Sequence, residues 1–260
     1  MKKSLFFILL MAILGCYKDN FLRDAFTSQQ GQLPLEIQVL EMPLQPTDGY
    51  ATISSYATLS TQGYTGGTVI QGFCYDKQNK KRDFGALAFG PLIMSPPNEA
   101  DPDYFSVGAP EGESLFGLTN QVSLVGKDEL PGFTTNFYVP KIMLIISPSF
   151  SNNSMIAAGN TITWVPDPKN VHGVGISIKY SPTDIENVWL QLGGKSVSRS
   201  IRVGDIGSYT IREKDLADIP SQGSLRLQIG RGNYKIVPMA DNYRFGLLAY
   251  TTVAHSFNKQ

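Results

Sequence analysis

The 260-residue chain contains few of the residues on which many known sites depend. With only two histidines and two cysteines, it lacks the Cys/His clusters and the H-E-x-x-H motif of zinc sites. Its 22 basic and 22 acidic side chains cancel, so the composition argues against a nucleic-acid partner. There is also no G-x-S-x-G elbow, no P-loop and no dinucleotide fingerprint. We therefore expect no catalytic activity.

Only the first fifteen residues form a long apolar run. Lys2 and Lys3 precede an apolar stretch at 4–15, which has the length of a secretory signal peptide and is short of the roughly 20 residues needed to cross a bilayer. The run ends in Ile-Leu-Gly-Cys at 13–16, which resembles the lipobox of bacterial lipoproteins. That resemblance implies cleavage before Cys16 and lipid attachment to its thiol. The alternative is an ordinary secretory signal followed by a chance cysteine.

If Cys16 is acylated, the second cysteine has no partner in the chain. Cys74 lies in the apolar stretch TVIQGFCYDK, where a free thiol behaves as a small buried hydrophobic group. A reactive thiol is the alternative, although no histidine stands near it in sequence to activate it.

The rest of the composition predicts an all-β protein. Aromatic residues are frequent, with 12 Tyr and 14 Phe, and 25 Gly and 16 Pro supply turns. We expect a lipidated tether at 16–34 and two antiparallel β-sandwich domains, at 35–150 and 151–260. In the first domain, alternation begins at Leu35, and the polar stretch 77–82 is predicted to be a hairpin tip whose basic residues are either solvated or bound to an anionic partner. The apolar run before Pro148 predicts a buried strand.

Residues 95–132 are rich in proline, glycine and acids, apart from one weaker strand in TNQVSLVG, and they predict a long loop. Glu99, Asp101 and Asp103, together with Asn98, offer closely spaced oxygen ligands for Ca²⁺, although the spacing fits an EF-hand only loosely. A solvated acidic loop is the simpler interpretation. A third hypothesis is a glycan-cleaving pair of carboxylates, drawn from four residues of this loop: Asp101, Asp103, Glu111 and Glu113.

Aromatic residues in and near this loop suggest binding. An exposed platform for a sugar face or a protein partner would be formed by Tyr104, Phe105, Phe116 and Tyr138. The alternative places most of these rings in the core.

From Thr161 onward the period of two is nearly continuous. Short strands spaced about a dozen residues apart favour an antiparallel sandwich of immunoglobulin type, with Trp164 as its core aromatic residue. The stretch REKDLADIP predicts the one helical turn, with Leu216 and Ile219 on its buried side.

About 100 residues of this half also resemble a known group of proteins. The similarity rests on Trp164–Asp167, the GVGISIKY strand, the turn at 205–211, the helical turn at 215–220 and Arg231-Gly232 before the final AYTT strand. This pattern is similar to the C-terminal β-sandwich of uncharacterised Bacteroidota cell-envelope lipoproteins. The resemblance implies a fold and a lipid-anchored place at the outer membrane, on its periplasmic or its surface side, and it implies no catalytic residue.

The sequence thus leads to two functional hypotheses. The first is a lipid-anchored envelope protein that binds a glycan or another envelope protein, with the membrane as a further partner through its lipid. The second is a glycan-cleaving accessory protein that uses paired carboxylates in the loop at 95–115. No cofactor is expected, apart from the calcium ion considered above.

Overall fold

A computed structural model describes residues 47–60, 63–78, 80–96, 104–107, 110–128, 130–147, 155–180, 197–219 and 224–259. These residues are mostly β-strand, which confirms the predicted all-β class. The first 46 residues, which include Cys16 and the predicted signal peptide, tether and strand at Leu35, lie outside the described residues.

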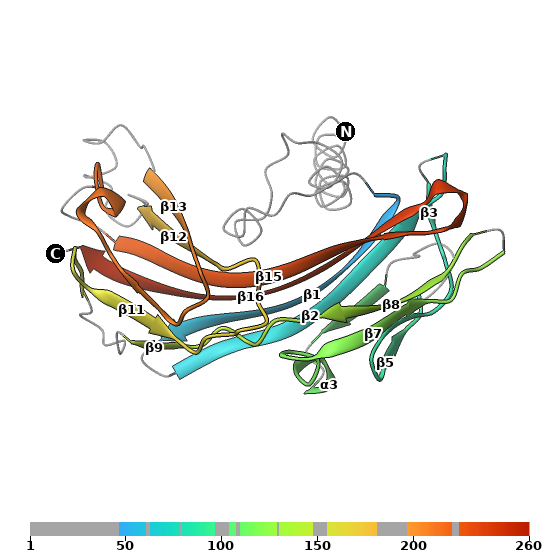
Figure 1. Ribbon diagram of the computed structural model, residues 1–260, viewed down its shortest axis with the longest axis horizontal. Coiled ribbons are helices and arrows are strands. Elements are labelled where there is room, and N and C mark those ends of the chain that lie inside the picture. The colour runs from blue at the N-terminus through green and yellow to red at the C-terminus, as the bar shows by residue number, and fades with distance from the viewer. Residues whose placement is uncertain are drawn as a thin grey trace, which may run out of the picture.

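A long, curved sheet of nine strands runs the length of the molecule (Figure 1). Its order is β13-β12-β15-β16-β1-β2-β3, with β10 beside β16 and β6 beside β2. The strands are β1 (Gly49–Ser60), β2 (Gly63–Tyr75), β3 (Lys81–Arg82), β6 (Tyr104–Val107), β10 (Met155–Ile156), β12 (Val174–Tyr180), β13 (Val197–Val203), β15 (Ser224–Pro238) and β16 (Arg244–Lys259).

Two smaller sheets accompany the long one. Four strands form the first: β5 (Leu92–Met94), β4 (Leu87–Phe89), β7 (Thr119–Leu124) and β8 (Phe133–Tyr138). Three form the second: β14 (Ser208–Thr210), β11 (Thr161–Trp164) and β9 (Ile145–Ser147). The short helices are α3 (Pro110–Glu113), η2 (Glu213–Asp215) and η3 (Ala240–Asn242).

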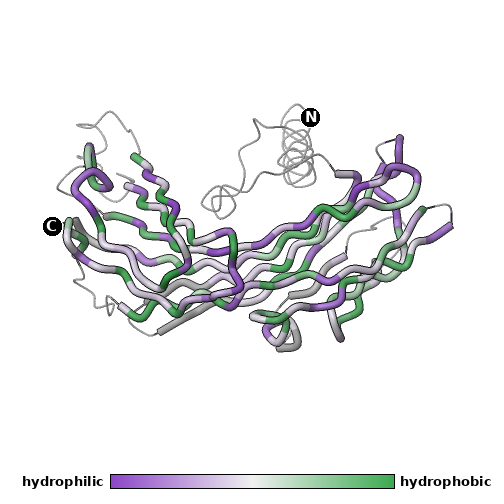
Figure 2. Tube along the Cα trace, in the orientation of Figure 1, coloured by the Kyte–Doolittle hydropathy of each residue, from purple (hydrophilic) through white to green (hydrophobic). Residues whose placement is uncertain are grey.

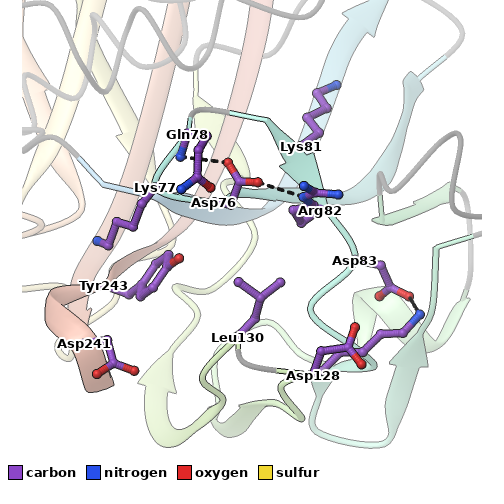
Figure 3. Close-up of a pocket in the computed structure, with 11 residues that line it drawn as sticks. Asp76, Lys77, Gln78, Lys81, Arg82, Asp83, Asp128, Leu130, Asp241 and Tyr243 are labelled. Carbon is purple, nitrogen blue, oxygen red and sulfur yellow. Dashed lines mark hydrogen bonds and ion pairs between the residues drawn. The ribbon is translucent and has the colours of Figure 1, made fainter.

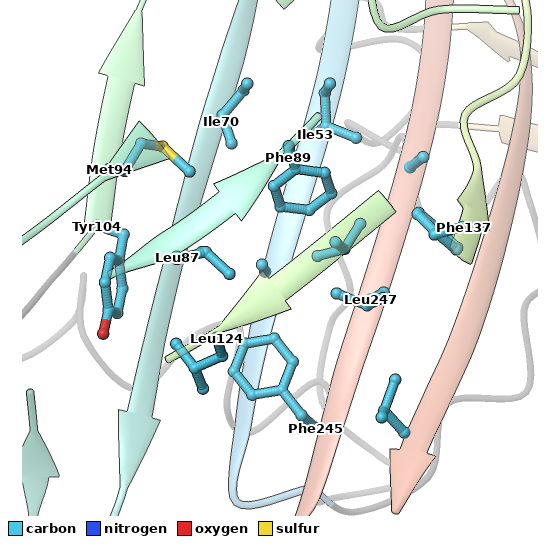
Figure 4. Packing of buried hydrophobic residues seen from close by; sticks show 14 of the residues in the cluster. Ile53, Ile70, Leu87, Phe89, Met94, Tyr104, Leu124, Phe137, Phe245 and Leu247 are labelled. Atoms are coloured by element: carbon cyan, nitrogen blue, oxygen red, sulfur yellow. The ribbon is translucent and has the colours of Figure 1, made fainter. Parts of the chain in front are cut away.

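Each small sheet packs on the long sheet over its own hydrophobic core. The first core joins β1, β2 and β16 to the four-stranded sheet, as Ile53, Phe89 and Leu247 illustrate (Figure 4). The second joins β12 and β15 to the three-stranded sheet and contains Trp164. Both cores lie on one face of β16, because its alternate residues Phe245, Leu247, Ala249 and Val253 are all buried in them.

The hairpin of β15 and β16 is the element that both cores share. Its register is continuous from Ser224 opposite Asn258 to Pro238 opposite Arg244. β16 also pairs in parallel with β1 over ten residues, so the C-terminal strand lies beside the first strand of the described residues. The boundary expected near residue 150 does not separate the sheets: β9 of the second small sheet precedes it, and the long sheet contains strands from both halves.

In the C-terminal strands that the structure describes, the residues predicted to share a core face do lie in the core. Ile162 and Trp164 are buried together on β11, as are the even-numbered residues of β12 from Val174 to Tyr180. Leu216 and Ile219 are buried beside η2, as the helical turn predicted. The predicted tip at 77–82 is also a turn, although only two residues of β3 return along β2.

Two predictions are wrong. The apolar run before Pro148 is not one buried strand: β8 ends at Tyr138, β9 begins at Ile145, and Leu144 and Ile146 are exposed. The backbone between β8 and β9 crosses between the small sheets, where Met143 N donates to Thr251 Oγ1 over 2.9 Å instead of joining a strand. The stretch 95–132 is also more regular than predicted: β7 is the strand expected at TNQVSLVG, but β6 and α3 lie in the part expected to be a loop.

Candidate functional site

An open cleft of about 960 Å³ lies at the end of the molecule where three turns meet. These are the turn after β2, the turn between β7 and β8, and the turn between β15 and β16 (Figure 3). Figure 2 shows that the turns at this end are largely hydrophilic. The cleft is lined by four acids (Asp76, Asp83, Asp128, Asp241), four bases (Lys77, Lys81, Arg82, Lys127), Gln78, Leu130 and Tyr243.

Asp48, at the start of β1, ties two of these turns together. Its carboxylate accepts from Lys77 Nζ over 3.2 Å and from the backbone N–H of Arg244 over 2.9 Å. The same ammonium group donates to the carbonyl oxygen of Asn242 over 3.1 Å and lies 3.8 Å from the centre of the Tyr243 ring. The β2 turn and the β15–β16 turn are therefore held at a fixed separation.

The β15–β16 turn owes its shape to two residues in the left-handed region. Asp241 and Asn242 have φ values of 55° and 59°. Asp and Asn adopt this conformation more easily than other side-chain-bearing residues, which suits them to a tight hairpin turn. The turn presents the Asp241 carboxylate at the rim of the cleft.

Asp76 organises the β2 turn from within. It accepts from the backbone N–H groups of Gln78 and Lys80, each over 2.9 Å, and from Arg82 Nε over 2.7 Å. The Lys80 hydrogen bond, together with the interactions with Arg82 and Gln78, outweighs desolvation and lowers the pKa of Asp76 below its usual value. The carboxylate is therefore charged at neutral pH and fixes Arg82 in the cleft wall.

A second ion pair attaches the β7–β8 turn. Lys127 Nζ lies 2.8 Å from Asp83 Oδ2, and the backbone N–H of Gly85 also donates to this carboxylate. Burial raises the pKa of Asp83, but these two hydrogen bonds more than offset it, so the pKa lies below its usual value. Each of the three turns is thus tied to a neighbour by a charged group.

Some polar groups of the cleft remain uncommitted. Within the described residues, the exposed carboxylates of Asp128 and Asp241 have no hydrogen-bond or ion-pair partner. The guanidinium of Arg82 donates through Nε to Asp76. Its two terminal nitrogens form no hydrogen bond with any described residue. These groups can donate to or accept from a molecule that enters the cleft.

A second polar cluster, which we call the seam, lies buried between the two cores. At its centre Arg231 of β15 is completely buried, and its Nη1 lies 3.0 Å from Asp205 Oδ2. Arg231 Nη2 donates to the carbonyl oxygen of Val165 over 2.6 Å. Asp205 also accepts from Trp164 Nε1 over 2.8 Å and from Asn170 Nδ2 over 2.9 Å. Desolvation lowers the pKa of Arg231, and the nearby Asp205 opposes that shift.

The seam extends to Tyr138 at the end of β8, in the first small sheet. Tyr138 OH lies 2.7 Å from both oxygens of Asp167, which also accepts from the backbone N–H of Lys141. Burial and the Asp167 hydrogen bond raise the pKa of Tyr138. Asn233 Nδ2 donates to the Tyr138 carbonyl oxygen over 2.8 Å. Among the described residues these groups bond mainly to one another, although Arg231 Nε and Asn170 Oδ1 are buried without a hydrogen-bond partner. The contacts join the small sheets to the long one.

Tyr104, Phe116 and Tyr138 do not form the predicted aromatic platform. Tyr104 is completely buried in the first core, and its hydroxyl donates to the Gly85 carbonyl oxygen over 2.6 Å. Phe116 packs against the same core, and Tyr138 belongs to the seam. The Phe105 side chain lies outside the described part. Tyr104 is therefore a core residue and offers no exposed ring.

The predicted carboxylate sites fall mostly outside the described residues. Asn98, Glu99, Asp101 and Asp103 are not described, nor is the side chain of Glu111, while Glu113 is exposed at the end of α3. Among the residues that are described, no group of three or more His, Cys, Asp or Glu is arranged to hold a metal ion. In the same residues, no helix has the length and hydrophobicity to span a membrane.

Cys74 is buried in the first core, as its apolar neighbours predicted. Burial, with a smaller effect from Asp83, raises the pKa of its thiol well above the usual value. The thiolate needed for a reactive cysteine is therefore disfavoured.

The sequence indicated one wall of the cleft and missed the others. The basic tip at 77–82 was recognised, but Asp128, Asp241 and Tyr243 are far from it in sequence and carry no motif. Comparison adds no assignment: no family model, no curated protein and no solved structure matches the chain. The resemblance to envelope lipoproteins and the immunoglobulin-like assignment of residues 151–260 stay predictions.

Proposed function

We propose that this protein is a lipid-anchored cell-envelope protein that binds a glycan in the cleft at the three turns. The observation that carries the proposal is the cleft itself, in which ion pairs fix the walls and leave other polar groups uncommitted. Preorganised walls favour binding because fewer side chains must be ordered when the ligand enters.

The charge balance of the cleft supports a neutral, polyhydroxylated ligand. Four carboxylates face four basic groups, so a polyanion or a polycation would meet like charges as well as opposite ones. A sugar hydroxyl both donates and accepts, and can bridge Asp241 or Asp128 to a donor such as Arg82. Leu130 and Tyr243 add apolar surface at the floor, although Lys77 already occupies one face of the Tyr243 ring.

The lipid anchor follows from the sequence at 13–16, and the position of the cleft is consistent with it. The chain enters the described fold at Thr47, next to Asp48, which ties the cleft turns together. The cleft therefore lies at the end of the described fold where the chain from Cys16 enters it. In this proposal the protein retains glycans close to the membrane surface.

The binding proposal is tested by screening the protein on a glycan array and measuring affinity for the best polysaccharide by calorimetry. The double variant Asp128→Asn/Asp241→Asn should bind roughly tenfold to a hundredfold more weakly, because hydrogen bonds to charged groups contribute about 1.5–3 kcal/mol. Glu213→Gln is the matched control, since Glu213 is an exposed acid beside the second core, away from the cleft.

Two results would contradict the proposal. One is the absence of retention on every glycan, and the other is equal binding by the cleft variant and the control. The anchor is tested separately with Cys16→Ser, which should lose the lipid mass and move from the membrane fraction to the soluble fraction. Unchanged fractionation would disprove the anchor and leave the cleft result standing.

A further inference from the structure

β13 (Val197–Val203) is an unusual edge strand for this molecule. In the described part of the chain it pairs with β12 alone, over seven residues. Several other edge strands are short: β3 has two residues, β6 has four, and β5, β9 and β14 have three each. Parts of the longer strands β2 (63–68) and β15 (232–238) also pair on one side only, but each continues a strand that is paired on both sides elsewhere. The six-residue edge of β8 is covered, because Lys235 Nζ donates to Thr135 Oγ1 over 2.6 Å and to the Asn136 carbonyl oxygen over 3.0 Å.

Two usual protections of an exposed edge, a proline and a bulge, are missing from β13. Proteins discourage edge pairing with proline, bulges, very short strands or charges that project from the edge. β13 contains no proline, and its register with β12 runs without a shift from Val203 opposite Val174 to Val197 opposite Tyr180. Among the described residues it is therefore a regular strand with one side open to extend the sheet.

Both arginines of β13 are engaged by the chain itself. Arg199 Nη2 lies 2.8 Å from Asp218 Oδ2 and 3.1 Å from the Ala217 carbonyl oxygen. Arg202 donates through Nε and Nη2 to the His172 carbonyl oxygen, at 3.1 and 2.6 Å. Because these contacts direct both guanidinium groups to atoms of the same chain, neither group projects from the edge to oppose strand pairing.

We propose that β13 pairs antiparallel with β13 of a second copy of this chain, about a two-fold axis at Ser200. The sequence V-S-R-S-I-R-V is complementary to itself in this register. Val197 faces Val203 of the second copy, Ser198 faces Arg202, and Arg199 faces Ile201. All seven residues pair and no arginine faces an arginine, whereas an axis at Arg199 would place two guanidinium groups together. Like charges directly opposite each other destabilise a strand pair, so the Ser200 register is favoured.

The contact is expected to be reversible. Pairing of two edges buries less than the roughly 1,200–2,000 Å² of a standard stable interface. The protein should therefore pass from monomer to dimer as its concentration rises. The inference is independent of the proposed glycan site, which lies among different strands.

The test is sedimentation velocity of the full chain in a mild detergent over a wide concentration range. The wild-type protein should shift toward twice the monomer mass as its concentration rises. Ser200→Asp and Ser200→Lys each place like charges at the axis, so each alone should self-associate about tenfold or more weakly. An equimolar mixture of the two should dimerise again, because opposite charges then meet. Ser200→Thr is the control and should behave as the wild type.

Ser200 is exposed, so these substitutions should leave the fold intact, and circular dichroism checks that they do. A wild-type protein that stays monomeric at every concentration would overturn the proposal. So would charged variants that each dimerise as well as the wild type. If the mixture fails to restore the dimer, the Ser200 register is wrong.

Discussion

The seam and the cleft are both clusters of charged and hydrogen-bonding side chains, but they differ in burial. In the seam, Arg231 and Asp205 are almost inaccessible to water, and backbone and side-chain groups of the same chain bond to both, with only Arg231 Nε left without a partner among the described residues. In the cleft, Arg82 is half exposed and Asp128 and Asp241 have no partner among the described residues. The same chemistry therefore has two uses: buried, it positions sheets; exposed and partly unpaired, it can bind a ligand.

The largest expected effect comes from breaking the seam. Arg231→Leu leaves Asp205 buried without its counter-charge, which should lower the free energy of unfolding by about 3–5 kcal/mol. Arg82→Leu is the matched cleft variant, and because an exposed ion pair contributes about 0–1 kcal/mol, its effect should be much smaller. Urea unfolding of both variants measures the difference.

Arg231→Lys provides an intermediate case. It keeps the charge near Asp205 but cannot reproduce the fork that also reaches the Val165 carbonyl oxygen, so its stability should lie between the wild type and Arg231→Leu. If Arg231→Leu were no more destabilising than Arg82→Leu, the contrast between the two clusters would be refuted.

A smaller effect is expected from pH and Asp76. Because its pKa is lowered in the folded state, its ionisation stabilises the fold above the unfolded pKa of roughly 4. That contribution should be lost as the pH falls through the folded pKa. Asp76→Asn should therefore lose about 1 kcal/mol at neutral pH and show a shallower decline in acid. Urea titrations between neutral and acidic pH test this, with Asp128→Asn as the control that should follow the wild type.

The smallest expected effect on stability is that of the double variant Asp128→Asn/Asp241→Asn. Both side chains are exposed and unpaired within the described residues, so the free energy of unfolding should change by less than about 0.5 kcal/mol. Thermal unfolding measures it. A large loss of stability would show that these carboxylates support the cleft turns, and the binding loss proposed for this variant would then need another explanation.

Sequence periodicity predicted local structure where one face of a strand is buried. The alternation through Val174, Ile176 and Ile178, and through Phe245, Leu247 and Ala249, correctly identified the core faces of β12 and β16. It failed between Tyr138 and Ile145, where apolar residues lie in a segment whose backbone bonds to the seam. Hydrophobicity alone does not reveal which partner a backbone group takes.

The sequence by itself determined the all-β class, the core faces of the principal strands, the burial of Cys74 and Trp164, and one charged turn of the cleft. These features depend on neighbours within a few residues, where the period of two and the preferences of turn residues act. Only the tertiary structure decided that the last hairpin unites both cores, that Arg231 meets Asp205, and that Asp128 and Asp241 share a cleft with Arg82. Those contacts join residues far apart in the chain, and their formation depends on strand order and register, which no local pattern encodes.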